Sequence, residues 1–97
     1  MAIKISWDPV PLRQFETAIR FIARDSMQNA EKVRKNIVDK SNQLLKHPDK
    51  HSPDNKKNND GRFRAFELHH YRISYFIGKD IIRIIRFRHT GMEPKKY

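Results

Sequence analysis

Four basic side chains lie in one apolar segment near the end of the chain, and their spacing points to a surface that binds phosphate. The segment IIRIIRFRHTG has the isoleucines and the phenylalanine of a β-strand, but it also carries Arg83, Arg86, Arg88 and His89. A small protein places cations in a strand only where they meet solvent or an anion. Guanidinium groups give forked hydrogen bonds to phosphate oxygens, and aromatic rings stack on bases. The pattern therefore favours contact with a phosphate backbone.

The charge of the whole chain supports this interpretation. Its 97 residues include 21 Lys and Arg but 11 Asp and Glu, which gives a formal net charge of +10 at pH 7. The segment from Arg62 onward alone carries an excess of six positive charges. Such an excess indicates a polyanionic partner, with nucleic acid as the first expectation. The alternative is that these arginines pair with Glu16, Glu31 or Glu67, or with solvent, and have no specific role.

Several other classes of chemistry are disfavoured by composition. The chain has no cysteine, which argues against disulfides, cysteine-based zinc sites and thiol catalysis. Its five histidines lack zinc-ligand spacing, and with only three glycines it has no phosphate-binding glycine loop, so we expect neither a metal nor a cofactor. No apolar run has the length of a signal peptide or a membrane span. We expect a single cytoplasmic domain over residues 1–97 without membrane contact.

The first part of the chain predicts a strand followed by two helices. Residues 2–7 alternate apolar and polar side chains, which is typical of a half-buried strand, and Asp8 and Pro9 then offer an N-cap and a helix start. Two apolar stripes at helical spacing follow, separated by a short break at residues 24–26, and so predict an antiparallel helical hairpin. The first stripe comprises Leu12, Phe15, Ile19 and Ile22; the second, within residues 27–45, comprises Ala30, Val33, Ile37, Ser41 and Leu44 or Leu45.

The second half of the chain predicts a polar loop and three strands. Residues 46–61 are rich in Asp, Asn, Lys and Pro, as in a loop. Strands are expected over 62–70, 71–77 and 81–89, with a hairpin turn at 78–80. The fold class is therefore α+β: an N-terminal strand, a helical hairpin and a three-stranded antiparallel meander, with the helices on one face of the sheet.

Side-chain alternation predicts which face of each strand is buried. In residues 71–77 the better core set is Tyr71, Ile73, Tyr75 and Ile77, which places Arg72 on the opposite face. In residues 81–89 neither alternating set is purely apolar. We therefore expect that strand to be covered at its start and to emerge toward its C-terminal end.

The C-terminal half also resembles a known family. The motif YRISY, the strand IIRIIRFRH at hairpin spacing and a tail ending in EPKKY are similar to the RelE/ParE superfamily of toxins from bacterial type II toxin-antitoxin modules. The opening strand and helical hairpin fit the order of elements in that family. The resemblance therefore spans essentially the whole chain and implies a RelE-like fold.

The resemblance implies two alternative activities. RelE-like members are metal-independent endoribonucleases that cut mRNA on the ribosome and so inhibit translation, whereas ParE-like members poison DNA gyrase without an evident nuclease site. A nucleic-acid-binding relative without toxicity is a third alternative. The resemblance also implies a cognate antitoxin that wraps the toxin, and the positive charge leads us to expect this partner to be acidic and partly disordered.

For the ribonuclease alternative, the resemblance implies particular site residues. Arg72 occupies the position of a phosphate-binding arginine, Tyr97 that of a C-terminal tyrosine, and His89 lies near a histidine that suits acid-base work. Asp54 or His51 are weaker candidates for the base. The expected RNA-binding or phosphate-binding residues are Lys56, Lys57, Arg64, Arg83, Arg86 and Arg88. One departure favours the gyrase alternative, because Gly91 and Met92 stand where many relatives carry an arginine in the tail.

Overall fold

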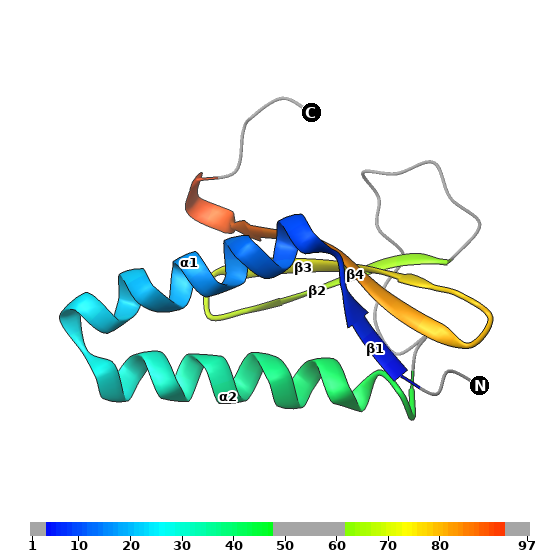
Figure 1. Ribbon diagram of the computed structural model, residues 1–97, viewed down its shortest axis with the longest axis horizontal. Helices are drawn as coiled ribbons and strands as arrows, with labels where there is room; N and C mark the ends of the chain where they lie inside the picture. Colours follow the sequence, from blue (N-terminus) through cyan, green and yellow to red (C-terminus); the bar gives the residue numbers. More distant parts are fainter. Residues whose placement is uncertain (1–3, 48–61, 93–97) are drawn as a thin grey trace.

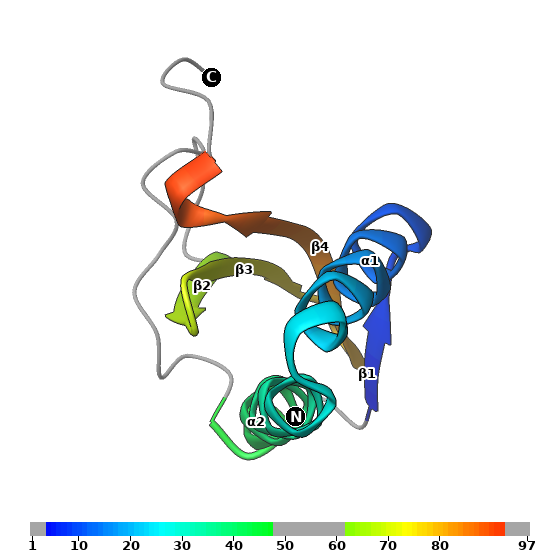
Figure 2. The same cartoon turned by 90° about the vertical axis from the view of Figure 1, so that its left-hand side faces the viewer.

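The chain folds as two helices packed on one side of a four-stranded sheet (Figure 1; Figure 2). The structure is a computed structural model that describes residues 4–47 and 62–92. The elements in chain order are β1 (Lys4–Trp7), α1 (Pro9–Asp25), α2 (Met27–Gln43), β2 (Phe63–Leu68), β3 (Tyr71–Ile77), β4 (Ile81–His89) and the short 3-10 helix η1 (Thr90–Met92). This order confirms the predicted α+β, RelE-like fold.

The start of α1 is held by a contact with the sheet. Pro9 opens the helix as predicted, but Asp8 at the N-cap position makes no side-chain capping hydrogen bond. Its carboxylate instead accepts two hydrogen bonds from Arg83 of β4, from Nε at 3.1 Å and from Nη2 at 2.7 Å. The backbone N–H of Asp8 donates to the carbonyl of Ile84 at 2.9 Å. The predicted cap is therefore wrong for the side chain, because Arg83 competes for that carboxylate with a charged, forked donor.

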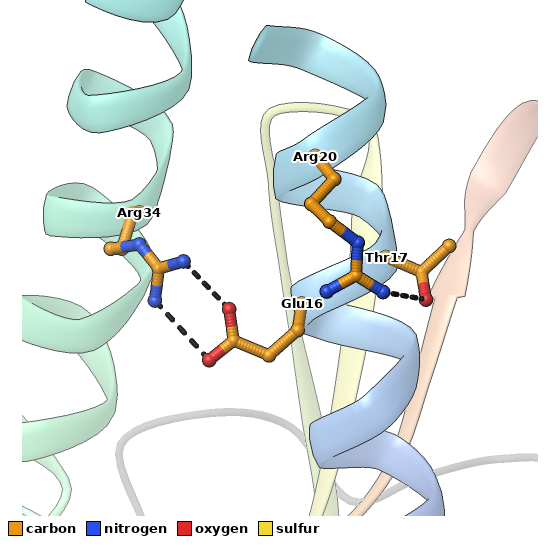
Figure 3. Close-up of polar contacts among 4 residues, drawn as sticks. All are labelled: Glu16, Thr17, Arg20 and Arg34. Carbon is orange, nitrogen blue, oxygen red and sulfur yellow. Dashed lines mark hydrogen bonds and ion pairs between the residues drawn. The ribbon is translucent and has the colours of Figure 1, made fainter.

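The two helices form the predicted antiparallel hairpin. Ser26 ends α1 and caps α2, where its hydroxyl accepts a hydrogen bond from the backbone N–H of Asn29 at 3.0 Å. Across the hairpin, Arg34 donates to both carboxylate oxygens of Glu16, at 2.6 and 3.4 Å (Figure 3). The guanidinium of Arg34 also lies 5.5 Å from the ring centroid of Phe15. These contacts fix the helices relative to each other at their exposed side.

The core lies between the helices and the sheet. In α2 the whole predicted apolar stripe is buried in this core, and of the two alternatives for its last position Leu44 is the buried one. In α1 Phe15 and Ile19 are buried as predicted, but Leu12 is 42% exposed, and Pro11 is buried instead. Leu12 was assigned to the stripe by spacing alone, whereas the first turn of α1 turns Pro11 toward the core. The sheet contributes the remaining buried apolar side chains of the core, which are Phe66, Tyr71, Ile73, Tyr75, Ile82, Ile84 and Phe87.

The sheet has the strand order β1-β4-β3-β2. β2, β3 and β4 form the predicted antiparallel meander, and β1 joins its outer edge by pairing in parallel with β4. The pairing of β3 with β4 shifts by one residue between Ser74 and Tyr75: Ser74 lies opposite Arg86, whereas Tyr75 lies opposite Ile84. Ile85 is therefore the extra residue of a β-bulge, and side chains after it change faces.

The bulge explains the mixed pattern of the last strand. Ile82 and Ile84 point into the core before it, and Phe87, which is 3% exposed, points into the core after it. The expectation that the strand emerges from cover toward its C-terminal end is thus wrong: Phe87 is buried, Arg86 and Arg88 are half-buried, and the exposed arginine is Arg83 near the start of the strand. Simple alternation put Phe87 together with Arg83, because a one-residue shift is invisible in the sequence pattern.

His69 and His70 form a tight turn between β2 and β3 and do not extend the strand as expected. Both have positive φ angles, 54° and 69°, which is the left-handed conformation that two-residue hairpin turns require. The side chain of His69 is held by a 2.9 Å hydrogen bond between its Nε2 and Nδ2 of Asn36. The carbonyl of His70 accepts from the backbone N–H of Thr90 at 2.7 Å and from its hydroxyl at 3.1 Å. The turn is therefore tied both to α2 and to the end of β4.

Most of the predicted polar loop lies outside the described residues. Lys46 and His47 follow α2 and are exposed, and residues 48–61 are not described. In the part of the chain that is described, neither helix is long and apolar enough to cross a membrane.

Candidate functional site

The sheet face turned away from the helices carries a group of arginines. In an antiparallel pair, residues directly opposite each other share a face. Arg72 of β3 lies opposite Arg88 of β4, and Ser74 lies opposite Arg86. Because Tyr71, Ile73 and Tyr75 point into the core, Arg72 and Ser74 point to the other side. This surface, which we call the open face, therefore gathers Arg72, Arg86 and Arg88 on two adjacent strands.

The arginines of the open face are held close to the protein surface. The side chain of Arg72 is only 19% exposed, and its Nη1 lies 3.4 Å from a carboxylate oxygen of Glu67 on β2. Ser74 between the arginines is buried. Nε of Arg88 is buried and has no hydrogen-bond partner among the described residues. Like charges directly opposite each other on a sheet are destabilising, so this arrangement favours an anion that bridges them.

The other two predicted phosphate-binding arginines, Arg64 and Arg83, differ from this group in their contacts or in the face that they occupy. Arg83 also lies on the open face, but its guanidinium is held by Asp8, whose hydrogen bonds and charge raise the pKa of Arg83. Arg64 lies opposite the buried Tyr75, so it points to the helix side of β2. The structure therefore brings Arg72, Arg86 and Arg88 together and separates Arg64 from them.

His89 lies on the opposite side of the sheet from Arg72. It pairs with Tyr71, and the two rings meet edge to face with centroids 5.1 Å apart. Nδ1 of His89 accepts a hydrogen bond from the backbone N–H of Gly91 at 3.1 Å. Burial raises the pKa of the Tyr71 hydroxyl above its ordinary value of 10.0. The predicted catalytic pair, Arg72 and His89, is thus divided by the sheet.

The remaining predicted site residues lie outside the described ranges. Tyr97, Lys56 and Lys57 belong to this group, as do the weaker candidates Asp54 and His51. In residues 4–47 and 62–92, no three histidine, aspartate or glutamate side chains lie close enough to hold a metal ion.

Sequence reasoning missed a groove on the helix side of the molecule. It has a volume of about 810 Å³ and lies between α1, the first half of α2, the β2–β3 turn and the end of β4. Phe21, which is 65% exposed, borders it, and Phe87 and Tyr71 contribute to its wall. The available sequence signal was Phe21 itself, a large apolar residue outside the predicted stripe of α1.

The order of elements and the four-stranded sheet are consistent with the RelE-like fold of the RelE/ParE toxin superfamily. The family described as "ParE toxin of type II toxin-antitoxin system, parDE" matches residues 5–94. The chain therefore belongs to the ParE toxin family of type II toxin-antitoxin systems. No curated protein matches the chain at a significant level.

Proposed function

We propose that this toxin inhibits DNA gyrase and does not cleave RNA. The observation that carries the proposal is the separation of Arg72 and His89 by the sheet. Cleavage at one phosphodiester needs a phosphate-binding cation and an acid or base within hydrogen-bond reach of the same group. Two side chains on opposite faces cannot meet this requirement together. Membership of the ParE family and the loss of the tail arginine at Gly91 and Met92 support the same activity.

A ribosome-dependent mRNA endoribonuclease is the second candidate, and the open face favours it. Arg72, Arg86 and Arg88 offer forked donors at the spacing of adjacent strands, which suits the oxygens of a phosphate backbone. In this case Arg72 binds the phosphate and Tyr97 takes part in proton transfer. His89 then acts only if the substrate reaches around the end of β4.

The partner that neutralises the toxin is proposed to be an acidic antitoxin. The net charge of +10 favours a partner of opposite charge, and association between such chains is accelerated by electrostatic attraction. We also propose a cytoplasmic location, because gyrase and mRNA on the ribosome, the two candidate targets, are found there.

Expression of the chain, combined with an assay of the purified protein, distinguishes gyrase inhibition from mRNA cleavage. The chain is expressed alone in a bacterium, mRNA cleavage is mapped by primer extension, and purified toxin is added to a gyrase supercoiling assay. The gyrase proposal requires loss of supercoiling with intact mRNA. Cleavage within translated codons that disappears with Arg72→Ala would instead establish the ribonuclease.

A matched variant makes the result specific. Arg20→Ala removes the same side chain from the exposed face of α1, where Arg20 bonds only to Thr17 at 3.2 Å among the described residues (Figure 3). It should retain whichever activity the chain has. If Arg72→Ala and Arg20→Ala lose activity equally, the loss reflects net charge and not the open face. Circular dichroism of both variants checks that each still folds.

A further inference from the structure

Two phenylalanines lie on the open face beside its arginines. Phe63 of β2 lies opposite Phe76 of β3, and their ring centroids are 4.9 Å apart. Because the neighbouring Tyr75 is fully buried in the core, Phe76 points to the other face of the sheet, away from both helices (Figure 2). Both rings are half-buried, and neither belongs to the hydrophobic core or to the side chains packed against it. The fold thus holds an aromatic pair outside its core.

The β-bulge of β4 brings arginines to the same face as this aromatic pair. Arg83 lies opposite Phe76 and so shares its face. In a regular strand Arg86, three residues further on, would point to the core side. The extra residue Ile85 turns Arg86 to the open face, where it lies opposite Ser74. Bulges of this kind often re-aim a side chain beside a functional site. Rings and guanidinium groups therefore follow one another along one surface.

The arginines next to the rings have donors that the protein does not use. Arg86 makes no hydrogen bond or ion pair to any other residue in the described ranges, and Nε of Arg88 is buried without a partner there. A buried donor without a partner is rare in native proteins. Arg72 differs, because it pairs with Glu67. Opposite β3, these positions repeat every second residue, or about 6.8 Å, which is comparable to the step between phosphates of an extended single strand.

We propose that the open face binds single-stranded nucleic acid, with bases stacked on the Phe63–Phe76 pair and successive phosphates held by Arg86 and Arg88. Aromatic rings that stack bases beside a positively charged track are the usual means of binding single strands, and some RNA-binding sheets stack two or three bases in this way. A duplex offers no unstacked base to the rings. The inference goes beyond gyrase inhibition, does not depend on it and requires no cleavage of the bound strand. RNA and DNA share the chemistry that is recognised.

The first test measures fluorescence anisotropy of labelled oligothymidylate and oligouridylate of about ten nucleotides, a length within the usual site size, with the purified toxin. Phe76→Ala should weaken binding about fivefold or more, which corresponds to about 1 kcal/mol for one stacked base. Phe76→Tyr keeps a ring and should bind within about twofold of the wild type. Phe21→Ala is the matched control, because it removes a ring that is 65% exposed on α1, and it should bind like the wild type.

The second test measures the salt dependence of binding between about 50 and 200 mM salt. Each phosphate contact on a single strand contributes about −0.7 to the slope of log K against log salt concentration, so Arg86→Ala should make the slope shallower by about 0.7. Arg86→Lys keeps the charge and should keep the slope. Arg20→Ala removes the same charge from α1 and should also leave the slope unchanged. Circular dichroism checks the fold of every variant, and Phe76→Leu, which keeps most of the apolar volume, replaces Phe76→Ala if the latter unfolds.

Four results would overturn the proposal. Neither oligonucleotide binds, or a duplex of the same length binds as tightly as the single strands. Phe76→Ala and Phe21→Ala behave alike, so that no base stacks on the aromatic pair. Arg86→Ala and Arg20→Ala change the slope equally, so that only net charge matters. Adenosine monophosphate displaces the oligonucleotide at equal concentration, which would assign the surface to a free nucleotide. Because gyrase is absent from both tests, each of these results leaves the gyrase proposal standing, and failure of that proposal leaves this one to be judged by binding alone.

Discussion

Substitution of Phe87 by alanine tests the β-bulge on which the arrangement of β4 depends. The ring of Phe87 is 3% exposed and stacks on Tyr71 with centroids 4.8 Å apart. It also meets the ring of Phe15 edge to face at 5.5 Å and that of Trp7 at 6.3 Å. If β4 had no bulge, Phe87 would share the open face with Arg83 and make none of these contacts. The energetic effect of its removal therefore reports on the strand register.

The expected loss of stability is large for a chain of this size. Replacing a fully buried phenylalanine by alanine costs about 3–5 kcal/mol, because transfer free energy is lost and a cavity remains. Domains of this kind are stable by about 5–15 kcal/mol in total, so the variant should lose a large fraction of its stability. At about 4 °C or more per kcal/mol, the melting temperature should fall by about 12 °C or more.

Urea unfolding followed by circular dichroism gives the free energy of unfolding of both proteins. Phe21→Ala is the matched control, because Phe21 is 65% exposed and its replacement should change stability by less than about 0.5 kcal/mol. A loss below about 1 kcal/mol for Phe87→Ala would refute the reasoning. Phe87 would then lie on the open face, and the bulge at Ile85 would be absent.

Two further predictions concern stability. The hydrogen bonds and charge of Arg34 lower the pKa of Glu16 from its ordinary value of 4.5, so the pair stabilises the fold above about pH 4.5 and the contribution is lost as the pH falls through the lowered pKa. Glu16→Gln should therefore cost at most about 1 kcal/mol at pH 7, since the pair is partly exposed, and the difference from wild type should shrink at pH 3 in urea titrations. An unchanged difference at pH 3 would mean that another contact of Glu16 is responsible. Gly78→Ala should cost about 1–3 kcal/mol in thermal unfolding, because its Cβ would lie 2.9 Å from the carbonyl oxygen of Ile81. Lys79→Ala, in the same turn and exposed, is the control, and equal effects would contradict the steric argument.

Local patterns predicted the elements well because each reflects physics within a few residues. The spacing of Ala30, Val33 and Ile37 marked the buried face of α2, and the alternation of Tyr71, Ile73 and Tyr75 marked the core side of β3. Leu12 and the side-chain cap at Asp8 were assigned wrongly. In both cases a tertiary contact decides: Pro11 reaches the core in place of Leu12, and Arg83 takes the carboxylate of Asp8.

The candidate site was predictable in its residue types but not in its arrangement. Sequence alone identified Arg72, Arg86, Arg88 and His89 as functional candidates. It could not say that Arg72 lies opposite Arg88 on the adjacent strand while His89 points to the other face of the sheet, because the face that each side chain shares depends on the strand register. The groove was missed for a related reason, since its walls come from both helices, one turn and one strand.

The sequence by itself determined the family, the order of elements and the basic character of this protein, because motifs, periodicity and charge are carried by the chain. Tertiary structure decided which side chains meet. A single extra residue at Ile85 turns Phe87 inward, and the pairing of β3 with β4 separates Arg72 from His89. These outcomes depend on the alignment of strands that are joined only through space, and the free energy that selects one register comes from the packed core.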